Sequence, residues 1–190
     1  MKRILLPAIG LFLLCQSAIG QTYTIDKYHT RVSFSATHFG ISHVEGNFKT
    51  VDASLISKRK DFTDAVISFT AQVASINTDV EFRDNDLKGA AYFDAAKYPE
   101  LTFKSIAFKR IKGNSYVLIG NITIHGVSKQ VAFSVTYNGT AITAMKQPTA
   151  GFTIKGTLNR LDFGVGSDPL TSGVSNQIQV SSNIEFTIGK

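Results

Sequence analysis

The chain has 190 residues, a formal charge of +6 at pH 7 and a single cysteine. This length suits one domain with a substantial buried core. The basic residues are scattered, and the longest cluster, at residues 58–60, is typical of a solvated turn, so the charge gives no support for a nucleic-acid partner.

The first twenty residues have the pattern of a secretory signal peptide. Two basic residues precede an apolar run over residues 4–15, and Ala18 and Gly20 are small enough for a signal-peptidase site. The apolar run is too short to cross ~30 Å of hydrocarbon, which argues against an uncleaved membrane anchor. We therefore predict that residues 1–20 are removed by cleavage near Gly20-Gln21.

The mature domain, residues 21–190, is expected in the periplasm or outside the cell. Cys15 leaves with the signal peptide, so the domain has no disulfide and must be stabilised by its core. Lys2 and Arg3 leave as well, which reduces the formal charge from +6 to +4. A charge of this size is mild and predicts no particular partner.

Alternation of apolar and polar residues dominates the chain from residue 22 onward. In the run RVSFSATHF, residues 31–39, one face carries Val32, Phe34 and, near its end, His38, a pattern typical of a half-buried strand. Residues 44–56 and 64–76 alternate in the same way. We predict one strand in each of these three segments.

A charged and aromatic stretch, RDNDLKGAAYFDAAKYPELTF at residues 83–103, interrupts the strands. Thr78 followed by Glu81 matches a capping box, and Gly89 suits a left-handed C-terminal cap, so a short helix is expected between them. Pro99 ends any helical tendency before the next strand. A single helix in a mostly-β chain packs economically over the open end of a barrel, where it would act as a lid.

Five further alternating runs follow, and they bring the predicted number of strands to eight. Gly113-Asn114 and Asn138-Gly139 lie between apolar runs, where residues that tolerate positive φ let strands reverse tightly. Sequential strands without regular helical crossovers favour an antiparallel sandwich or an up-and-down barrel. The five runs are residues 101–111, 115–125, 129–138, 150–160 and 178–188.

Phenylalanine is the dominant aromatic residue, with fourteen copies, of which only Phe12 falls in the signal peptide. Several share a strand face with other large apolar groups, such as Ile67 with Phe69 and Leu101 with Phe103. An eight-stranded barrel encloses just enough space either to be filled by such side chains or to hold one ligand. The residues alone leave both readings open.

Catalytic and metal-binding patterns do not stand out. His38 and His43 flank a predicted turn, but a third ligand at matching spacing is missing, so no metal site is expected. Ser167 in GSDPL lacks the context of a nucleophile elbow, and Asp84 and Asp86 point in different directions on a helix. We therefore expect neither an enzyme nor a cofactor.

Four stretches of the mature chain carry recognisable motifs: YTIDKYHTRVSFSATHFGISHVEGNF, SINTDVEFRDNDLKGAAYFDAAKYPELTF, GNITIHGVSKQV, and AGF followed by NRLDFG. In this order, they resemble the YceI-like family of exported polyisoprenoid-binding proteins. The resemblance covers essentially all of the mature chain. It departs from the family pattern at Asp86, where the family usually has His in Arg-Asp-x-His-Leu, and at Thr30, where Ser is common.

The resemblance implies an all-β fold, an eight-stranded antiparallel up-and-down barrel like that of lipocalins, with one short helix and loop near the barrel mouth. It also implies an apolar tunnel for a long isoprenoid. The alternation of side chains along each strand and the resemblance together predict the ligand-binding residues. They are Phe34, Phe69, Phe103, Phe133 and Phe152 for the lining, with His38 and Arg83 at the mouth.

Two functions follow as hypotheses. The first is a periplasmic or secreted binding protein that carries or stores a long isoprenoid or a similar amphiphilic lipid, such as an isoprenoid quinone or a polyprenyl phosphate, without catalysis. The second is an envelope interaction protein whose barrel is filled and which binds no small molecule. Transient contact with a membrane and pairing with a second copy stay open under either hypothesis.

Overall fold

The computed structural model describes residues 20–167 and 173–188. Most of the predicted signal peptide, residues 1–19, therefore lies outside the described residues. The strands are β1 (Gln21–Ile25), β2 (Arg31–His38), β3 (Ser42–Phe48), β4 (Val51–Ser57), β5 (Val66–Gln72), β6 (Ile76–Asn77), β7 (Glu100–Lys112), β8 (Ser115–Ile124), β9 (Val127–Ile142), β10 (Pro148–Asn159) and β11 (Val174–Ile188). The helices are η1 (Val73–Ser75), α1 (Glu81–Lys88) and η2 (Arg160–Phe163).

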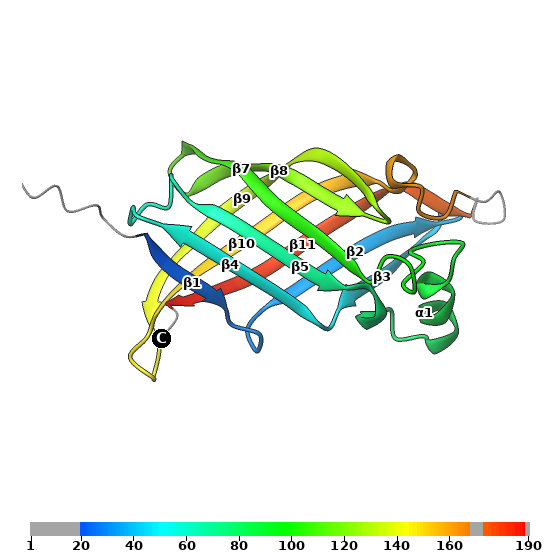
Figure 1. The fold of residues 1–190 in the computed structure, drawn as a ribbon, viewed down its shortest axis with the longest axis horizontal. Coiled ribbons are helices and arrows are strands. Elements are labelled where there is room, and N and C mark those ends of the chain that lie inside the picture. The colour runs from blue at the N-terminus through cyan, green and yellow to red at the C-terminus, as the bar shows by residue number, and fades with distance from the viewer. Residues whose placement is uncertain (1–19, 168–172, 189–190) are drawn as a thin grey trace, which may run out of the picture.

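Eight of these strands close into an antiparallel barrel (Figure 1). Their order is β1-β4-β5-β7-β8-β9-β10-β11, and pairing of β1 with β11 completes the ring. The predicted fold class, an all-β antiparallel barrel with one short helix, is confirmed. None of the helices in the described part of the chain is long and apolar enough to cross a membrane.

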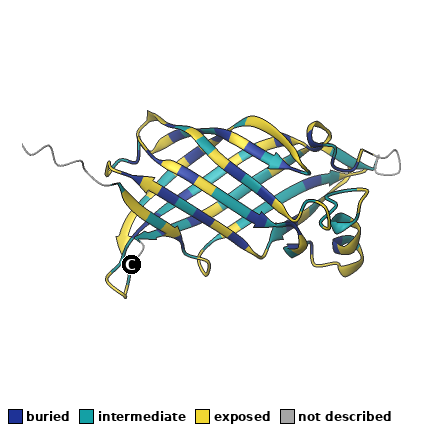
Figure 2. Ribbon diagram, viewed as in Figure 1, coloured by how far each residue is buried: buried dark blue, intermediate teal, exposed yellow. Residues whose placement is uncertain are grey.

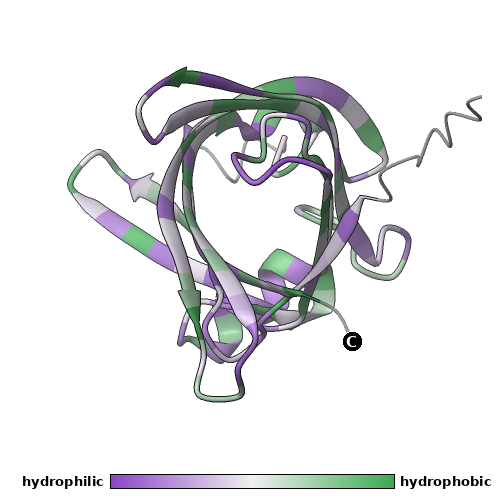
Figure 3. Cartoon of the chain, turned by 90° about the vertical axis from the view of Figure 1, so that its left-hand side faces the viewer, coloured by the Kyte–Doolittle hydropathy of each residue, from purple (hydrophilic) through white to green (hydrophobic). Residues whose placement is uncertain are grey.

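The two ends of the barrel differ (Figure 1). We call the end beside α1 the helix end, and the opposite end, which carries the turn between β4 and β5 at residues 58–65, the turn end. Figure 3 views the barrel from the turn end and shows the strands surrounding its axis.

The strands β2, β3 and β6 form an extension of the sheet. β11 pairs with β1 through residues 186–188 and with β2 over most of its remaining length, so its edge is shared between two strands. The single strand predicted at 44–56 is wrong, because Lys49 and Thr50 separate β3 from β4. The count of eight was right for the barrel, but it included β2 and missed the five-residue strand β1.

Buried and exposed residues alternate along the strands, as the colours of Figure 2 show. In β4, Val51, Ala53, Leu55 and Ser57 are all buried, while Asp52 and Ile56 between them are exposed. Since successive side chains of a strand point to opposite faces, this alternation places one apolar face of every long strand inside the barrel. The core and the candidate site are thus built from the same inward-facing positions.

Candidate functional site: an apolar cavity inside the barrel

A cavity of about 140 Å³ lies between the inner faces of the strands. Its aromatic lining consists of Phe34, Phe48, Phe69, Phe103, Phe108, Phe133, Phe152 and Phe186. Its aliphatic lining consists of Val32, Ala53, Leu55, Ile67, Leu101, Leu118, Ile122, Val135, Ile154, Leu158, Val180 and Ile184. Three serines complete the wall: Ser33, Ser181 and Ser182. No charged side chain of the described residues lines this cavity.

The structure brings together all five phenylalanines that the sequence predicted for the lining. They come from five different strands: Phe34 on β2, Phe69 on β5, Phe103 on β7, Phe133 on β9 and Phe152 on β10. Phe103 and Phe133 meet edge to face, with ring centroids 5.8 Å apart. The alternation of side chains along each strand therefore predicted which of these side chains line the cavity.

Three of these rings pack closely against a glycine of a neighbouring strand, a feature that the sequence analysis missed. A Cβ added to any of the three glycines would overlap the ring above it. The glycine leaves room for the ring to lie against the wall instead of projecting into the barrel, as in aromatic rescue of strand glycines. The pairs are Gly46 with Phe34, Gly120 with Phe103, and Gly156 with Phe133.

Phe62 closes the turn end of the barrel, and the sequence analysis gave it no role. Its side chain is only 3% exposed, and its ring meets those of Tyr23, Tyr137 and Phe152 edge to face at centroid distances of 5.6, 5.5 and 5.4 Å. Its φ of 58° is uncommon for a bulky residue, and the surrounding turn must hold it there.

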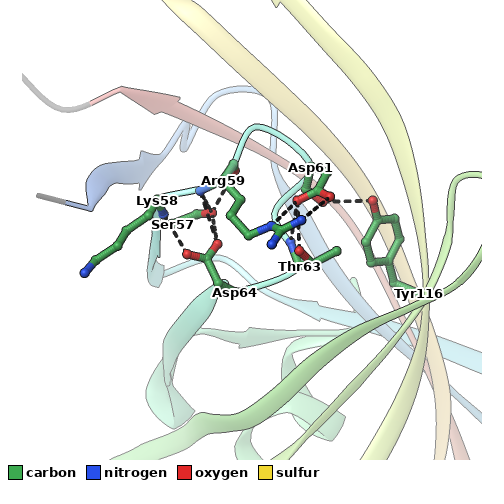
Figure 4. A network of polar contacts seen from close by, with 7 residues as sticks. All are labelled: Ser57, Lys58, Arg59, Asp61, Thr63, Asp64 and Tyr116. Atoms are coloured by element: carbon green, nitrogen blue, oxygen red, sulfur yellow. Dashed lines mark hydrogen bonds and ion pairs between the residues drawn. The ribbon is translucent and has the colours of Figure 1, made fainter. Parts of the chain in front are cut away.

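A network of polar contacts fixes that turn (Figure 4). Asp64 accepts hydrogen bonds from Ser57 Oγ at 2.5 Å and from the backbone N–H of Lys58 at 3.0 Å. Asp61 accepts from Arg59 Nε at 3.1 Å, and this bond and those from Thr63 lower the pKa of Asp61 to about 2. The basic cluster at 58–60, predicted to be a solvated turn, is exposed here.

Tyr116 connects the same turn to the barrel wall. Its hydroxyl donates to the Asp61 backbone carbonyl at 2.9 Å, and its ring stacks on Phe108 with centroids 4.8 Å apart. Phe108 lines the cavity. The position of the turn, and with it of Phe62, is therefore tied to the cavity wall.

At the helix end, the loop after α1 covers the cavity lining more directly than α1 itself does. Phe93 meets Phe48 edge to face at 6.2 Å, and Phe48 both lines the cavity and contacts Phe34 at 5.9 Å. Tyr92 also packs against the core. The predicted helix exists, but the aromatic side chains of its return loop provide the contact with the lining.

The predicted caps of α1 are wrong. Thr78 is not part of a capping box, because its Oγ donates to the buried carboxylate of Asp84 at 2.6 Å. Gly89 has an extended conformation, with φ of −71°, instead of a left-handed one. A buried carboxylate that accepts both the Thr78 hydroxyl and the Thr78 N–H replaces the expected N-terminal cap and fixes the approach to the helix.

Neither polar residue predicted for the mouth lines the cavity. Arg83 donates from Nε to Thr78 Oγ and from its guanidinium NH2 to the Thr78 carbonyl, both at 2.8 Å, so it holds the chain entering α1. His38 is exposed at the end of β2, with its ring 4.4 Å from that of Phe39. Asp86, the departure from the family pattern, is also exposed.

A polar cluster that the sequence spacing did not reveal lies outside the cavity. Among the described residues, Asp26, His29 and Glu185 place one ligand atom each within 4.8 Å of the others, close enough to share a metal ion. His29 Nδ1 and Asp26 Oδ2 already form an ion pair at 2.9 Å. His29 and Glu185 are 156 residues apart, which explains why the spacing of residues in the sequence did not predict this cluster.

This ion pair gives the stability a defined pH dependence. The hydrogen bond with Asp26 raises the pKa of His29 above 6.5, and the same bond lowers the pKa of Asp26 below 3.8. The contribution of Asp26 is lost as the pH falls through its lowered pKa, and that of His29 is lost as the pH rises through its raised pKa. The pair is therefore fully stabilising between about pH 4 and pH 6.5.

We expect His29→Asn to lower the urea midpoint of unfolding more at pH 5 than at pH 8.5. Far-UV circular dichroism at the two pH values measures the difference, and His43→Asn, at another exposed histidine, serves as the control. An equal loss at both pH values would show that the charge of His29 does not stabilise the fold.

Comparison with known proteins connects this hollow barrel to a family. The model of the YceI-like domain matches residues 23–186, nearly the whole described structure. The chain belongs to the YceI-like family. Its relatives include a UPF0312 protein of Pseudomonas putida (strain W619), 33% identical over 168 residues that cover 87% of this chain and 88% of the relative. A UPF0312 protein of Photorhabdus laumondii is 32% identical over 165 residues, or 86% of this chain and 85% of the relative.

Solved structures show the same fold for this YceI-like chain. BcnA of Burkholderia cenocepacia has a TM-score of 0.77 at 26% identity, and the match covers 85% of this chain and 98% of BcnA. A polyisoprenoid binding domain from Saccharophagus degradans has a TM-score of 0.69, with coverage of 89% and 99%. Its sequence identity is 12%, so this second likeness concerns the fold alone.

Proposed function

We propose that this YceI-like protein binds a long isoprenoid or a similar amphiphilic lipid in its apolar cavity, and that it carries or stores this lipid in the periplasm or outside the cell. The observation that carries the proposal is the cavity itself, which lies inside a closed barrel and is lined by aromatic and aliphatic side chains. The proposed role is binding, without catalysis. The polyisoprenoid binding domain with the same fold supports it at the level of architecture.

The driving force is burial of the lipid chain. Each CH₂ group moved from water into an apolar lining contributes about 0.8 kcal/mol, and this outweighs the cost of ordering the chain when many groups are buried. Apolar burial is non-directional, so an isoprenoid quinone fits the same lining. Loading from a membrane would require transient contact with its surface.

The size of the cavity adds a condition. A volume of about 140 Å³ is small for a chain of several tens of carbons. Uptake of such a chain therefore requires the cavity to widen.

Uptake of a defined isoprenoid tests the proposal. We expect delipidated protein to extract labelled geranylgeraniol from phosphatidylcholine vesicles and to retain it through gel filtration. Phe69→Asp should abolish retention, because it places a carboxylate in the apolar wall, whereas Ile106→Asp, at a side chain 59% exposed on β7, should not. Circular dichroism establishes that each variant is folded.

A folded wild-type protein that takes up no geranylgeraniol or other long-chain lipid would contradict the proposal. Cross-linking to a stoichiometric protein partner in that case would favour the interaction protein with a filled barrel.

A further inference from the structure

Of the three serines that border the apolar cavity in the described structure, Ser182 is the one on the inward face of its strand. Along β11, the inward positions are occupied by Val180, Ser182, Ile184 and Phe186, all of which line the cavity. The Oγ of Ser182 is buried and has no hydrogen-bond partner within residues 20–167 and 173–188. Among the described side chains, it is the one buried polar atom left in this state.

The neighbours of Ser182 offer it nothing polar. It lies opposite Val32 of β2 and Ile154 of β10, and both line the cavity. Ser33 and Ser181, which also border the cavity, alternate with the inward positions, so their hydroxyls point to the outer face. The Ser182 hydroxyl is thus isolated in an apolar wall, about midway along β11.

The described residues of the fold supply no hydrogen bond to the hydroxyl at this position. A buried hydroxyl without a partner destabilises the folded state, and the smaller alanine side chain would fit this position without that cost. The Ser182 hydroxyl would gain a hydrogen-bond partner if a bound ligand supplied one.

We infer that the Ser182 hydroxyl binds an uncharged polar group of the lipid, such as an alcohol, carbonyl or amide, inside the barrel. The inference rests on the proposed function and narrows its ligand class. A phosphate at this depth would lose its hydration, because no charged side chain among the described residues lines the cavity. Arg31 pairs with Asn183, the residue after Ser182, but its side chain is on the outer face of β2. There its Nε donates to Ser33 Oγ at 3.3 Å. The structure therefore favours a lipid with a neutral polar group over a phosphorylated one.

Competition between two probes tests this inference. Delipidated protein is incubated with equimolar geranylgeraniol and the hydrocarbon that lacks only its hydroxyl, and mass spectrometry of the organic extract gives the ratio of the two. We expect wild type to prefer the alcohol. Ser182→Ala should lower the alcohol-to-hydrocarbon ratio roughly 3- to 10-fold, as expected for loss of one buried hydrogen bond, with hydrocarbon uptake unchanged.

Two variants control this result. Ser182→Thr retains a hydroxyl and should retain the preference for the alcohol. Ser134→Ala removes an exposed hydroxyl on β9, which donates to the Lys155 carbonyl, and should leave the ratio unchanged. A merely structural role of Ser182 would alter stability without altering the ratio.

The outcomes separate the inference from the proposed function. An unchanged ratio in Ser182→Ala, or stronger uptake of geranylgeranyl phosphate than of the alcohol by wild type, would overturn the inference and leave lipid binding intact. Failure of folded wild type to take up any of these probes would overturn lipid binding, and the inference with it.

Discussion

Replacing Phe62 by alanine is expected to lower the free energy of unfolding by about 3–5 kcal/mol, the usual cost of removing a buried phenylalanine side chain. The ring is 3% exposed and contacts three other aromatic rings at the turn end of the barrel. Its removal leaves a space beside Phe152, which lines the cavity. Urea unfolding followed by far-UV circular dichroism measures the change.

Phe82→Ala is the matched control for this experiment. Phe82 lies on α1 with 78% of its surface exposed, so its truncation should change stability by no more than about 0.5 kcal/mol. A loss below about 1 kcal/mol in Phe62→Ala would contradict the role of Phe62 in closing the turn end.

Gly156→Ala is expected to reduce uptake of geranylgeraniol roughly 10-fold or more, in a protein that still folds, because overpacking typically costs only 1–3 kcal/mol of stability. The new Cβ would overlap Phe133 Cδ1 and lie 3.0 Å from Cε1. The three atoms nearest to it all belong to the Phe133 ring, so that ring must turn away from the wall and into the cavity. Retention of labelled geranylgeraniol through gel filtration measures the effect.

Gly151→Ala provides the control on the same strand. A Cβ at Gly151 would have its nearest neighbour, Asn138 Cβ, at 3.6 Å, which is an ordinary contact, so uptake should remain unchanged. Equal uptake by wild type and a folded Gly156→Ala variant would show that the lipid does not occupy the space beside Phe133.

The barrel and its lining were largely predictable from local patterns. Alternation with period two identifies which residues of a strand face inward, so it placed Phe69 and Phe103 correctly without knowledge of the pairing. The same alternation places Ser182 inward, but a serine in a strand pattern gives no sign that its hydroxyl will lack a partner. That information appears only when the neighbouring strands are in register.

Other features depend on contacts that are distant in sequence or on short segments. β1 has only five residues, and its place in the barrel follows from pairing with the far end of the chain. Phe62 lies in a turn, where alternation gives no prediction, and its burial follows from the polar contacts of Asp61 and Asp64. The capping box was predicted wrongly for the same reason. Thr78 and Glu81 fit a local motif, but the buried partner of Thr78 is Asp84.

The most direct test of lipid binding is to identify what the protein carries. The full chain is expressed in a bacterium and purified without detergent, and an organic extract is analysed by mass spectrometry. We expect a near-stoichiometric lipid with a long apolar chain and an uncharged polar group. An empty extract from folded protein that also fails to take up added geranylgeraniol would contradict the account.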